Sequence, residues 1–430
     1  MIESSAMKSN LCLCLMAIGI AAGQTSGTRA FVGARLIDGT GKPAIEHATL
    51  IIRNGHVEAV GPSSRIKPPV RAERIDMTGK TIMPGLVNAH GHVADTMGLK
   101  AGPEFYTREN LLRQLGLYAR YGVTSVFSLG GDKEEAFKLR EEQATPPLRR
   151  ARVFLAGTII TADTPEDART MVDTVAATKP DIIKIRVDDN LGTTKKMSEP
   201  VYRAVIQEAH AKGLRVAAHL FYLDDAKSLL KDGADIVAHS IRDQDIDAET
   251  IALLKARDVC VIPTLTREVS AFAYGETPEF FNDPFFLREA DPQVLAQLRE
   301  PARQKAMRES ASAKGYKAGL EVANRNLKRL SEAGVRIAFG TDTGPPARFQ
   351  GYFEHMELEM MVKAGLTPMQ ALNAATGDAA RCMKVTGQVG TLERGAWADF
   401  LVLGANPIAD IHNTKTLESV WIAGDRLPGK

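Results

Sequence analysis

The chain has 430 residues, of which 44% are hydrophobic and 25% are charged, and this composition excludes a disordered, a collagen-like and a coiled-coil protein. The 54 Lys and Arg and the 52 Asp and Glu leave a formal net charge of +2, with no dense basic run. A net charge this close to zero argues against a protein that binds the nucleic-acid backbone. The length suits two or three domains, or one large barrel with a smaller domain.

The first 23 residues have the pattern of a secretory signal peptide. Lys8 precedes an apolar run over residues 11–22, and small residues follow it. The run is too short to cross a bilayer, which needs about 20 residues, so we expect no stable membrane insertion. The alternative is a buried N-terminal helix. We predict an exported protein, periplasmic or secreted, cleaved near residues 22–24, whether translation starts at Met1 or Met7.

Residues 28–82 and 388–427 have the patterns of β-strands. An Asn54-Gly55 pair joins two strand-like runs within residues 48–60, which predicts a hairpin with a type I′ turn. A second hairpin pattern spans residues 398–425. Neither end of the chain has enough strands for a stable sheet of its own. We therefore predict one small β-sandwich domain built from both termini.

Residues 83–387 alternate short apolar strands with amphipathic helices, which predicts an α/β fold, a (β/α)₈ TIM barrel. Gly213, Gly233 and Gly334 each end a helical pattern just before a strand. A doubly wound sheet is the alternative, but no GxGxxG motif opens a strand–helix turn. The eight predicted strands are Ile82–Val93, Val123–Leu129, Val153–Ile160, Ile182–Val187, Val216–Leu220, Ile236–Ser240, Val259–Leu265 and Val335–Thr341.

The segment between the seventh and eighth predicted strands is much longer than the other connections. Residues 266–320 carry four prolines between residues 278 and 301, and then a long polar helix. We predict an insertion over the mouth of the barrel, where loops determine which substrate is accepted.

Polar side chains follow several predicted strands at their C-terminal ends. His90 and His92 end the first strand and, at positions i and i+2, share a face. His219, His239 and Asp342 end the fifth, sixth and eighth strands. Each histidine alone could be an ordinary core residue, and the aspartate a turn residue. Because barrel enzymes place their sites at these ends, the combination predicts a metal centre.

The fourth strand places Lys184 on the face that points into the barrel. A buried lysine is costly unless its charge is removed or paired. One interpretation is an ion pair with Asp188 or with a neighbouring strand. The other is that neutral Lys184 reacts with carbon dioxide to form a carbamate, whose oxygens can bridge two divalent ions.

Together these residues resemble the amidohydrolase superfamily of metal-dependent hydrolases. The similarity rests on the strand-end residues, on the PGLVNAHGH motif at Pro84–His92, and on a second motif, Gly390–Leu403. The chain is most similar to the imidazolonepropionase-like branch, which includes dipeptidases that cleave before proline or a basic residue. Residues 355–368 resemble the helix that follows the barrel in that branch.

The resemblance implies that two divalent metal ions, zinc being preferred, bind at these strand ends. A hydroxide between the ions would attack a polarised carbonyl. Asp342 would be the catalytic residue that moves the proton to the departing nitrogen. The implied ligands are His90, His92 and Asp342 for one ion, His219 and His239 for the other, and carboxylated Lys184 between them.

Some positions differ from the dipeptidase pattern. Phe221 stands where relatives often have a tyrosine two residues after the strand-five histidine, and Tyr222 follows it. Arg186, Tyr222 and Thr264 are candidate substrate contacts. Their structural alternatives are an ion pair in the barrel lumen, a core aromatic and a strand-end hydroxyl.

The leading hypothesis is an exported hydrolase with two metal ions that cleaves an amide, peptide or cyclic-amide C–N bond of a small molecule or short peptide, a dipeptidase being one form. A deaminase or imidazolonepropionase with one metal ion is the alternative. Those relatives lack the bridging lysine and typically have a glutamate shortly after the strand-five histidine, where residues 220–225 have none. A binding protein without catalysis is a third hypothesis, and a homo-oligomer is left open.

Overall fold

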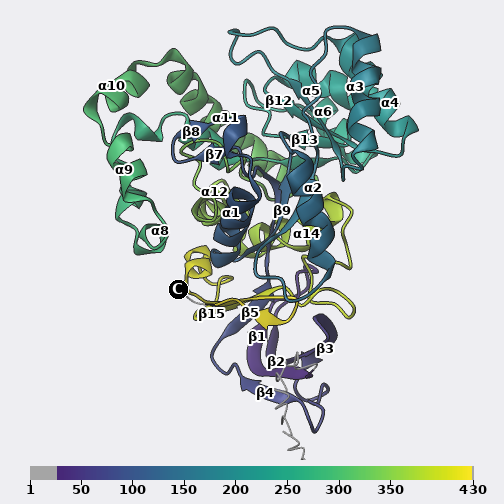
Figure 1. Ribbon diagram of the computed structural model, residues 1–430, viewed down its shortest axis with the longest axis vertical. Helices are drawn as coiled ribbons and strands as arrows, with labels where there is room; N and C mark the ends of the chain where they lie inside the picture. Colours follow the sequence, from purple (N-terminus) through teal and green to yellow (C-terminus); the bar gives the residue numbers. More distant parts are fainter. Residues whose placement is uncertain (1–26, 429–430) are drawn as a thin grey trace, which may run out of the picture.

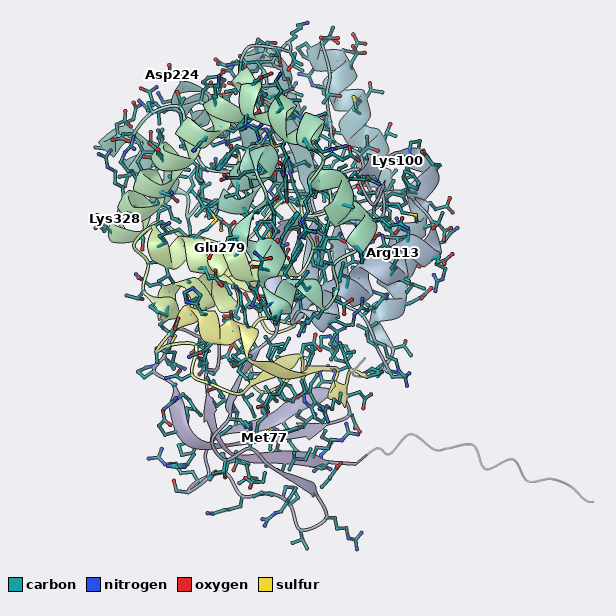
Figure 2. The ribbon with its side chains drawn as sticks, turned by 90° about the vertical axis from the view of Figure 1, so that its left-hand side faces the viewer. Met77, Lys100, Arg113, Asp224, Glu279 and Lys328 are labelled. Carbon is teal, nitrogen blue, oxygen red and sulfur yellow. The ribbon has the colours of Figure 1, made fainter. Side chains whose placement is uncertain are left out.

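The structure is a computed structural model that describes residues 27–428, so the predicted signal peptide lies outside the described residues. A β-sheet forms one end of the molecule and an α/β part forms the rest (Figure 1). Figure 2 shows Met77 at the sheet end and Asp224, at the start of α5, at the opposite end. Among the described residues, no helix is both long and apolar enough to span a membrane.

Strands from both termini form one eight-stranded sheet, which we call the terminal sheet. Strand β5 joins the two termini because it pairs with β1 on one side and with β15 on the other. The shared sheet agrees with the predicted composite, and its description as a sandwich stays a prediction. The strands are β1 (Arg29–Leu36), β2 (Ile45–Arg53), β3 (His56–Pro62), β4 (Glu73–Asp76), β5 (Thr81–Pro84), β15 (Phe400–Leu403), β16 (Leu417–Ile422) and β17 (Asp425–Arg426).

The predicted hairpin between β2 and β3 is confirmed. Asn54 and Gly55 have φ angles of 50° and 80°, and a type I′ turn requires positive φ at both central residues. The core of the terminal sheet combines residues from both ends of the chain. The rings of Phe400 and Trp421 stack at 5.5 Å, and Phe31 meets both edge-on.

The α/β part contains two parallel sheets whose strand order follows the chain. Helices follow the strands along the chain, and α3 to α6 lie at the end of the molecule away from the terminal sheet (Figure 1). This is a TIM-barrel-type α/β fold. The first sheet is β6 (Leu86–Gly91), β9 (Val123–Ser128) and β10 (Arg152–Leu155), and the second is β11 (Ile183–Val187), β12 (Val216–Leu220), β13 (Ile236–Ala238) and β14 (Cys260–Ile262).

Single parallel bridges connect the two sheets in place of the continuous eight-stranded barrel that we predicted. Ile160 bridges to Ile185 on one side, whereas Ile337 and Thr343 bridge to Val261 and Gly91 on the other. The predicted eighth strand, residues 335–341, is therefore not a regular strand. It lies so close to β6 that a Cβ atom on Gly340 would come within 2.9 Å of the His90 nitrogen.

Three other predicted strands are much shorter than expected, and the second, fourth and sixth are shorter by one or two residues. The predicted first strand, residues 82–93, divides into β5 and β6 at Gly85, which passes too close to Thr124 for any side chain. The third, residues 153–160, ends at Leu155. The seventh, residues 259–265, ends at Ile262, since Thr264 takes a left-handed φ of 51° and α7 begins at the next residue.

The predicted helix ends are confirmed, since Gly213 and Gly334 follow the helices that end at Ala211 and Glu332 with left-handed φ angles of 72° and 70°. Gly233 ends α5 with a φ of 111°, which favours glycine. Thr367 caps α13 through a capping box with Gln370. Apart from the short helices of the insertion, the helices are α1 (Arg108–Arg120), α2 (Glu134–Glu141), α3 (Pro165–Ala177), α4 (Glu199–Ala211), α5 (Leu223–Asp232), α6 (Ala248–Ala256), α11 (Ala311–Glu332), which begins within the predicted insertion, α12 (Tyr352–Lys363), α13 (Pro368–Ala374) and α14 (Gly377–Cys382).

The segment predicted as an insertion is mostly helical and lies beside α1 and α12 (Figure 1). Its aromatic residues, such as Phe281 and Phe286, share a buried cluster with Tyr121 at the end of α1 and with Phe353 of α12. The segment thus has a core of its own against this flank. Its short helices are α7 (Leu265–Ser270), α8 (Pro284–Leu287), α9 (Pro292–Leu298) and α10 (Pro301–Glu309).

A buried ion pair fastens the terminal sheet to the α/β part. Nε of Arg152, on β10, donates to Oδ2 of Asp399 at 2.6 Å, and both side chains are 2% exposed. The guanidinium also lies 4.2 Å from the ring centre of Trp397. We expect Arg152→Ala to lower the free energy of unfolding by about 3–5 kcal/mol, because it leaves a buried carboxylate unpaired.

Denaturant unfolding of Arg152→Ala and of a control variant, each compared with the unmodified protein, measures the loss in the free energy of unfolding. The control is Arg35→Ala, which removes a partly exposed pair with Glu46 and should cost about 0–1 kcal/mol. Similar losses in the two variants would contradict the role of Arg152.

Candidate metal centre

The four histidines predicted at the strand ends lie together in the structure. The ring centres of His90 and His239 are 4.6 Å apart, those of His219 and His239 are 4.2 Å apart, and those of His90 and His92 are 5.6 Å apart. Lys184 joins this cluster, with its Nζ atom 3.3 Å from Nε2 of His90. The side chains come from β6 and the residue after it, from β11 and β12, and from the residue after β13, because parallel strands end at the same edge.

Asp342 completes the cluster from the segment that follows the predicted eighth strand. Its Oδ1 atom lies 2.9 Å from Nε2 of His92 and 3.6 Å from Nε2 of His90. Ligand atoms of these three residues all lie within 4.8 Å of one another. Two imidazoles and one carboxylate at such distances can hold a divalent metal ion.

Three of the imidazole rings are held from outside the cluster. Nδ1 of His92 donates to the carbonyl oxygen of Gly130 at 3.1 Å. Nε2 of His219 donates to Oδ2 of Asp188 at 2.7 Å, and Nδ1 of His239 lies 2.7 Å from Oγ1 of Thr264. Metal-binding histidines are commonly oriented through their second nitrogen in this way.

The inner nitrogen atoms consequently face one another. Nδ1 of His219 and Nε2 of His239 are 2.7 Å apart, so they share at most one proton. Nδ1 of His92 carries a proton, which it donates to the carbonyl oxygen of Gly130. Nε2 of His92 therefore contacts Asp342 favourably only if it is also protonated or if a cation lies between the two atoms. This set of nitrogen and carboxylate donors with inward lone pairs fits divalent ions such as zinc.

Lys184 is buried, and Asp188 is not its partner. Burial lowers the pKa of Lys184 to about 7, although the nearby Asp342 carboxylate acts in the opposite direction. Asp188 instead bonds to His219 and lies 3.7 Å from Arg186. The interpretation of Lys184 as the ion-pair partner of Asp188 is therefore wrong.

The Asp342 carboxylate is surrounded by positive groups. Nη1 of Arg348 donates to its Oδ2 atom at 2.5 Å, and Nε of Arg267 lies 3.5 Å from the same atom. Burial alone would raise the pKa of Asp342, but Arg348 and the neighbouring histidines hold it well below its usual range. Asp342 therefore stays ionised and available as a ligand.

Three residues at the ends of the strands have left-handed backbone conformations. The φ angles of His239, Thr264 and Asp342 are 82°, 51° and 56°. Such conformations are uncommon outside glycine and cluster at functional sites, where the surroundings enforce them. Their position around one cluster supports a functional role for it.

A buried carboxylate that the sequence analysis missed lies behind the cluster. Glu354 of α12 accepts hydrogen bonds from Asn88, Thr341 and Thr343 through Oε1, at 2.6–2.8 Å. It thereby joins β6 to the segment that carries Asp342. The sequence signal was three glutamates on one helix, Glu354, Glu357 and Glu359. The second of them, Glu357, binds the backbone nitrogens of residues 265 and 266.

The predicted substrate contacts take different positions. Arg186 hydrogen-bonds to Asn190 and lines a cavity of about 390 Å³ that Asp188 also lines. The hydroxyl of Tyr222 donates to Asp189 at 2.8 Å. Thr264 is buried, and its hydroxyl contacts Nδ1 of His239.

The bond between Asp188 and His219 leads to a testable expectation. We expect Asp188→Asn to weaken metal binding by about 10–100-fold, since the carboxylate orients the ring and fixes its tautomer. Metal titration with a competing chelator measures this, and Asp189→Asn, which removes the carboxylate that binds Tyr222, is the control. Equal affinity in Asp188→Asn and the unmodified protein would contradict the role.

Comparisons with known proteins add to this geometry. The sequence profile of the "Amidohydrolase family" matches residues 81–427. An uncharacterized protein of Mycobacterium tuberculosis is 28% identical over 344 residues, which cover 79% of this chain and 83% of the relative. An imidazolonepropionase of Rubrobacter xylanophilus is 24% identical over 387 residues, 83% of this chain and 85% of the relative.

Solved structures show the same fold. The crystal structure of a Xaa-Pro dipeptidase with bound methionine in the active site superposes with a TM-score of 0.74 and 21% identity. The match covers 94% of this chain and 100% of that chain. At 21% identity, this similarity shows that the two proteins share a fold.

Proposed function

Because the chain belongs to the amidohydrolase family and is a hydrolase acting on C–N bonds, we propose that it binds two divalent metal ions and hydrolyses an amide, peptide or cyclic-amide bond. The substrate would be a small molecule or a short peptide. The observation that carries this proposal is the meeting of four imidazoles, one lysine and one carboxylate at the strand ends.

The residues divide into two groups around Lys184. His90, His92 and Asp342 would hold one ion, and their ligand atoms already lie within 4.8 Å of one another. His219 and His239 would hold the other through their inner nitrogens. Metal ions bound there, zinc being favoured by the donor set, would supply Lewis acidity that activates water and polarises the scissile carbonyl.

Lys184 would serve as a carbamate between the two groups. Among the described residues, the hydrogen-bonding contact of its Nζ atom is with His90 alone, so no carboxylate binds it directly. Reaction with carbon dioxide forms one N–C bond and releases one proton. The resulting anion places two oxygens where the buried amine now lies, and metal ligation by oxygen then replaces an unpaired buried cation.

Asp342 would move the proton during hydrolysis. Its carboxylate reaches the centre through Oδ1, while Oδ2 is held by Arg348. A positioned carboxylate can take a proton from the attacking water and deliver it to the departing nitrogen. The fixed orientation of Asp342 supports this role, because Arg348 holds the group that carries the proton.

A second candidate is a deaminase or imidazolonepropionase with one metal ion. The His90, His92 and Asp342 group suits a single ion, and the similarity to an imidazolonepropionase favours this reading. Lys184 distinguishes the two candidates, because an enzyme with one metal ion has no use for a bridging group.

The proposal extends to the fold and the location of the enzyme. We propose that residues 335–341 close a (β/α)₈ barrel, since single bridges connect this segment to strands on both sides. The terminal sheet would fold as the predicted β-sandwich. The predicted signal peptide would direct export to the periplasm or the medium.

A substrate screen of the zinc-loaded protein tests the function. Dipeptides, N-acyl amino acids, lactams and amino-heterocycles would be compared, with product amines and ammonia as separate readouts. We expect release of an amine or ring opening, loss of turnover on chelation, and recovery on adding zinc. Ammonia release from heterocycles would favour the second candidate. Absence of turnover across the screen by protein with bound metal would contradict a hydrolase.

A further inference from the structure

Three arginines lie together beside the candidate metal centre. Arg242 follows β13, Arg267 lies in α7, and Arg348 lies in the loop before α12. Arg242 and Arg267 are 1% and 6% exposed. The carboxylates in contact with them are those of Glu268 and Asp342, and we call these five residues the arginine cluster.

The contacts of the cluster run from Asp342 toward Glu268. Arg348 and Arg267 meet Oδ2 of Asp342 at 2.5 and 3.5 Å. Nη1 of Arg267 then donates to Oε1 of Glu268 at 2.7 Å. Nε of Arg242 lies 3.0 Å from the same Glu268 atom without forming a hydrogen bond. The three arginines are therefore joined by a series of contacts that begins at the proposed proton carrier.

Several donors in this cluster make no hydrogen bond to the described residues, although Nε of Arg242 and Nε of Arg267 lie 3.0 and 3.5 Å from carboxylate oxygens of Glu268 and Asp342. Nε and Nη2 of Arg242 and Nε of Arg267 are buried and make no hydrogen bond within the part of the chain that the structure describes. A buried donor without an acceptor is costly, and a guanidinium N–H group more so. Unused donors of this kind indicate a place where an acceptor from outside the chain binds.

Aromatic rings hold two of these guanidinium groups in place. The Arg242 guanidinium lies 4.6 Å from the ring centre of Phe221, and that of Arg267 lies 4.9 Å from the ring centre of Tyr316. Stacking of this kind fixes the plane in which the N–H groups point. The donors are thus already arranged before a ligand binds.

The charges of the cluster do not balance. Three guanidinium groups face two carboxylates, Glu268 and Asp342. When Asp342 serves a metal ion through Oδ1, as the proposed function requires, its single charge is shared between that ion and the guanidinium groups of Arg267 and Arg348 at Oδ2. Buried cations without counter-charges are unfavourable, so an anionic ligand group would restore the balance.

We propose that the arginine cluster binds a carboxylate of the substrate, and that this carboxylate lies on the amine that departs. The inference rests on the proposed function. Arg267 and Arg348 both contact Asp342, which delivers the proton to the departing nitrogen. In an α-amino acid, one carbon separates the nitrogen from the carboxylate, so both groups reach their partners together. The substrate class is therefore N-acyl amino acids or dipeptides with a free C-terminal carboxylate, rather than neutral amides, ureas or lactams.

Paired substrates test the proposal on the zinc-loaded protein. A panel of N-acetyl-L-amino acids would be compared with the corresponding N-acetyl amino acid amides, which lack the negative charge. We expect kcat/KM to be about 100-fold or more higher for the acids, because a charge-assisted bidentate contact is lost in the amides. Equal kcat/KM for acids and amides would overturn the proposal while leaving the hydrolase in place.

Substitutions test whether the arginine cluster causes the preference for acids over amides. Arg348→Gln should reduce the acid-to-amide ratio at least about 10-fold, and Arg348→Lys, which keeps the charge but loses the planar fork, should give an intermediate ratio. Arg140→Gln removes an arginine whose partner is Asp181, far from the cluster, and should keep the full ratio. An unchanged ratio in both Arg348 variants would overturn the assignment.

A binding measurement separates this proposal from the proposed function. Calorimetry of the zinc-loaded protein with free amino acids and with amino acid amides needs no turnover. We expect the acids to bind more tightly, and Arg348→Gln to remove the difference. Binding of acids without hydrolysis of any pair would contradict the hydrolase and support the anion site. Equal binding of acids and amides would overturn the anion site.

Discussion

Replacing Lys184 by alanine is expected to lower kcat/KM by about 10³-fold or more, equivalent to a loss of about 4 kcal/mol of transition-state stabilisation. The amine lies 3.3 Å from His90, on the strand between the two histidine groups. Its loss removes the proposed bridging anion and leaves the His219 and His239 group without an anionic ligand. We therefore expect the variant to retain less metal than the unmodified protein.

Chemical rescue distinguishes a bridging role from a structural one. A short carboxylic acid such as acetate or propionate can enter the space that the side chain leaves, so we expect partial recovery of turnover with rising acid concentration. Lys231→Ala removes an exposed lysine that pairs with Glu249 and serves as the control. Full activity of Lys184→Ala without added acid would contradict the bridging role.

The second large effect is expected at Asp342. Asp342→Asn keeps the size of the side chain but removes the charge and the ability to accept a proton. We expect kcat to fall by about 10²–10⁴-fold, the contribution of a positioned acid–base group. Arg348 and Arg267 also lose their counter-charge in this variant, so its metal content must be measured beside its turnover.

Metal content decides how the Asp342 result is interpreted. A large loss of turnover at unchanged metal content supports proton transfer by Asp342, and a loss of both supports ligation. Asp258→Asn, which removes an exposed partner of Arg336, is the control and should keep full activity. An Asp342→Asn variant with normal turnover and normal metal content would contradict both roles.

Much of the arrangement could be predicted from local patterns. The alternation of side chains along a strand placed His90 and His92 on one face. Parallel pairing then brings the ends of β12 and β13 together, since His219 pairs with Ala238, the residue before His239. The meeting of these side chains depends only on strand periodicity and on the common edge of a parallel sheet.

The contacts beyond the strand ends could not be predicted in this way. Asp188 bonds to His219 and not to Lys184, because the chain has already left β11 and alternation no longer fixes the direction of the side chain. Arg267 reaches Asp342 from α7, which begins directly after the left-handed residue Thr264, within the predicted seventh strand. Such loop conformations are set by tertiary packing rather than by local sequence.

The prediction of a regular eighth strand was wrong for a related reason. The apolar run 335–341 has a strand pattern, yet Gly340 brings it against the His90 backbone and Asp342 turns with a φ of 56°. Both features place Asp342 beside His92. The departure from regular strand structure therefore occurs where the carboxylate has to reach the histidines.

The two-metal centre is tested most directly by measuring the metal content of the purified protein and by locating the ions with anomalous diffraction at the zinc edge. We expect close to two ions per chain, one at His90, His92 and Asp342 and the other at His219 and His239. A fully active protein without bound metal, or ions bound only away from these histidines, would contradict it.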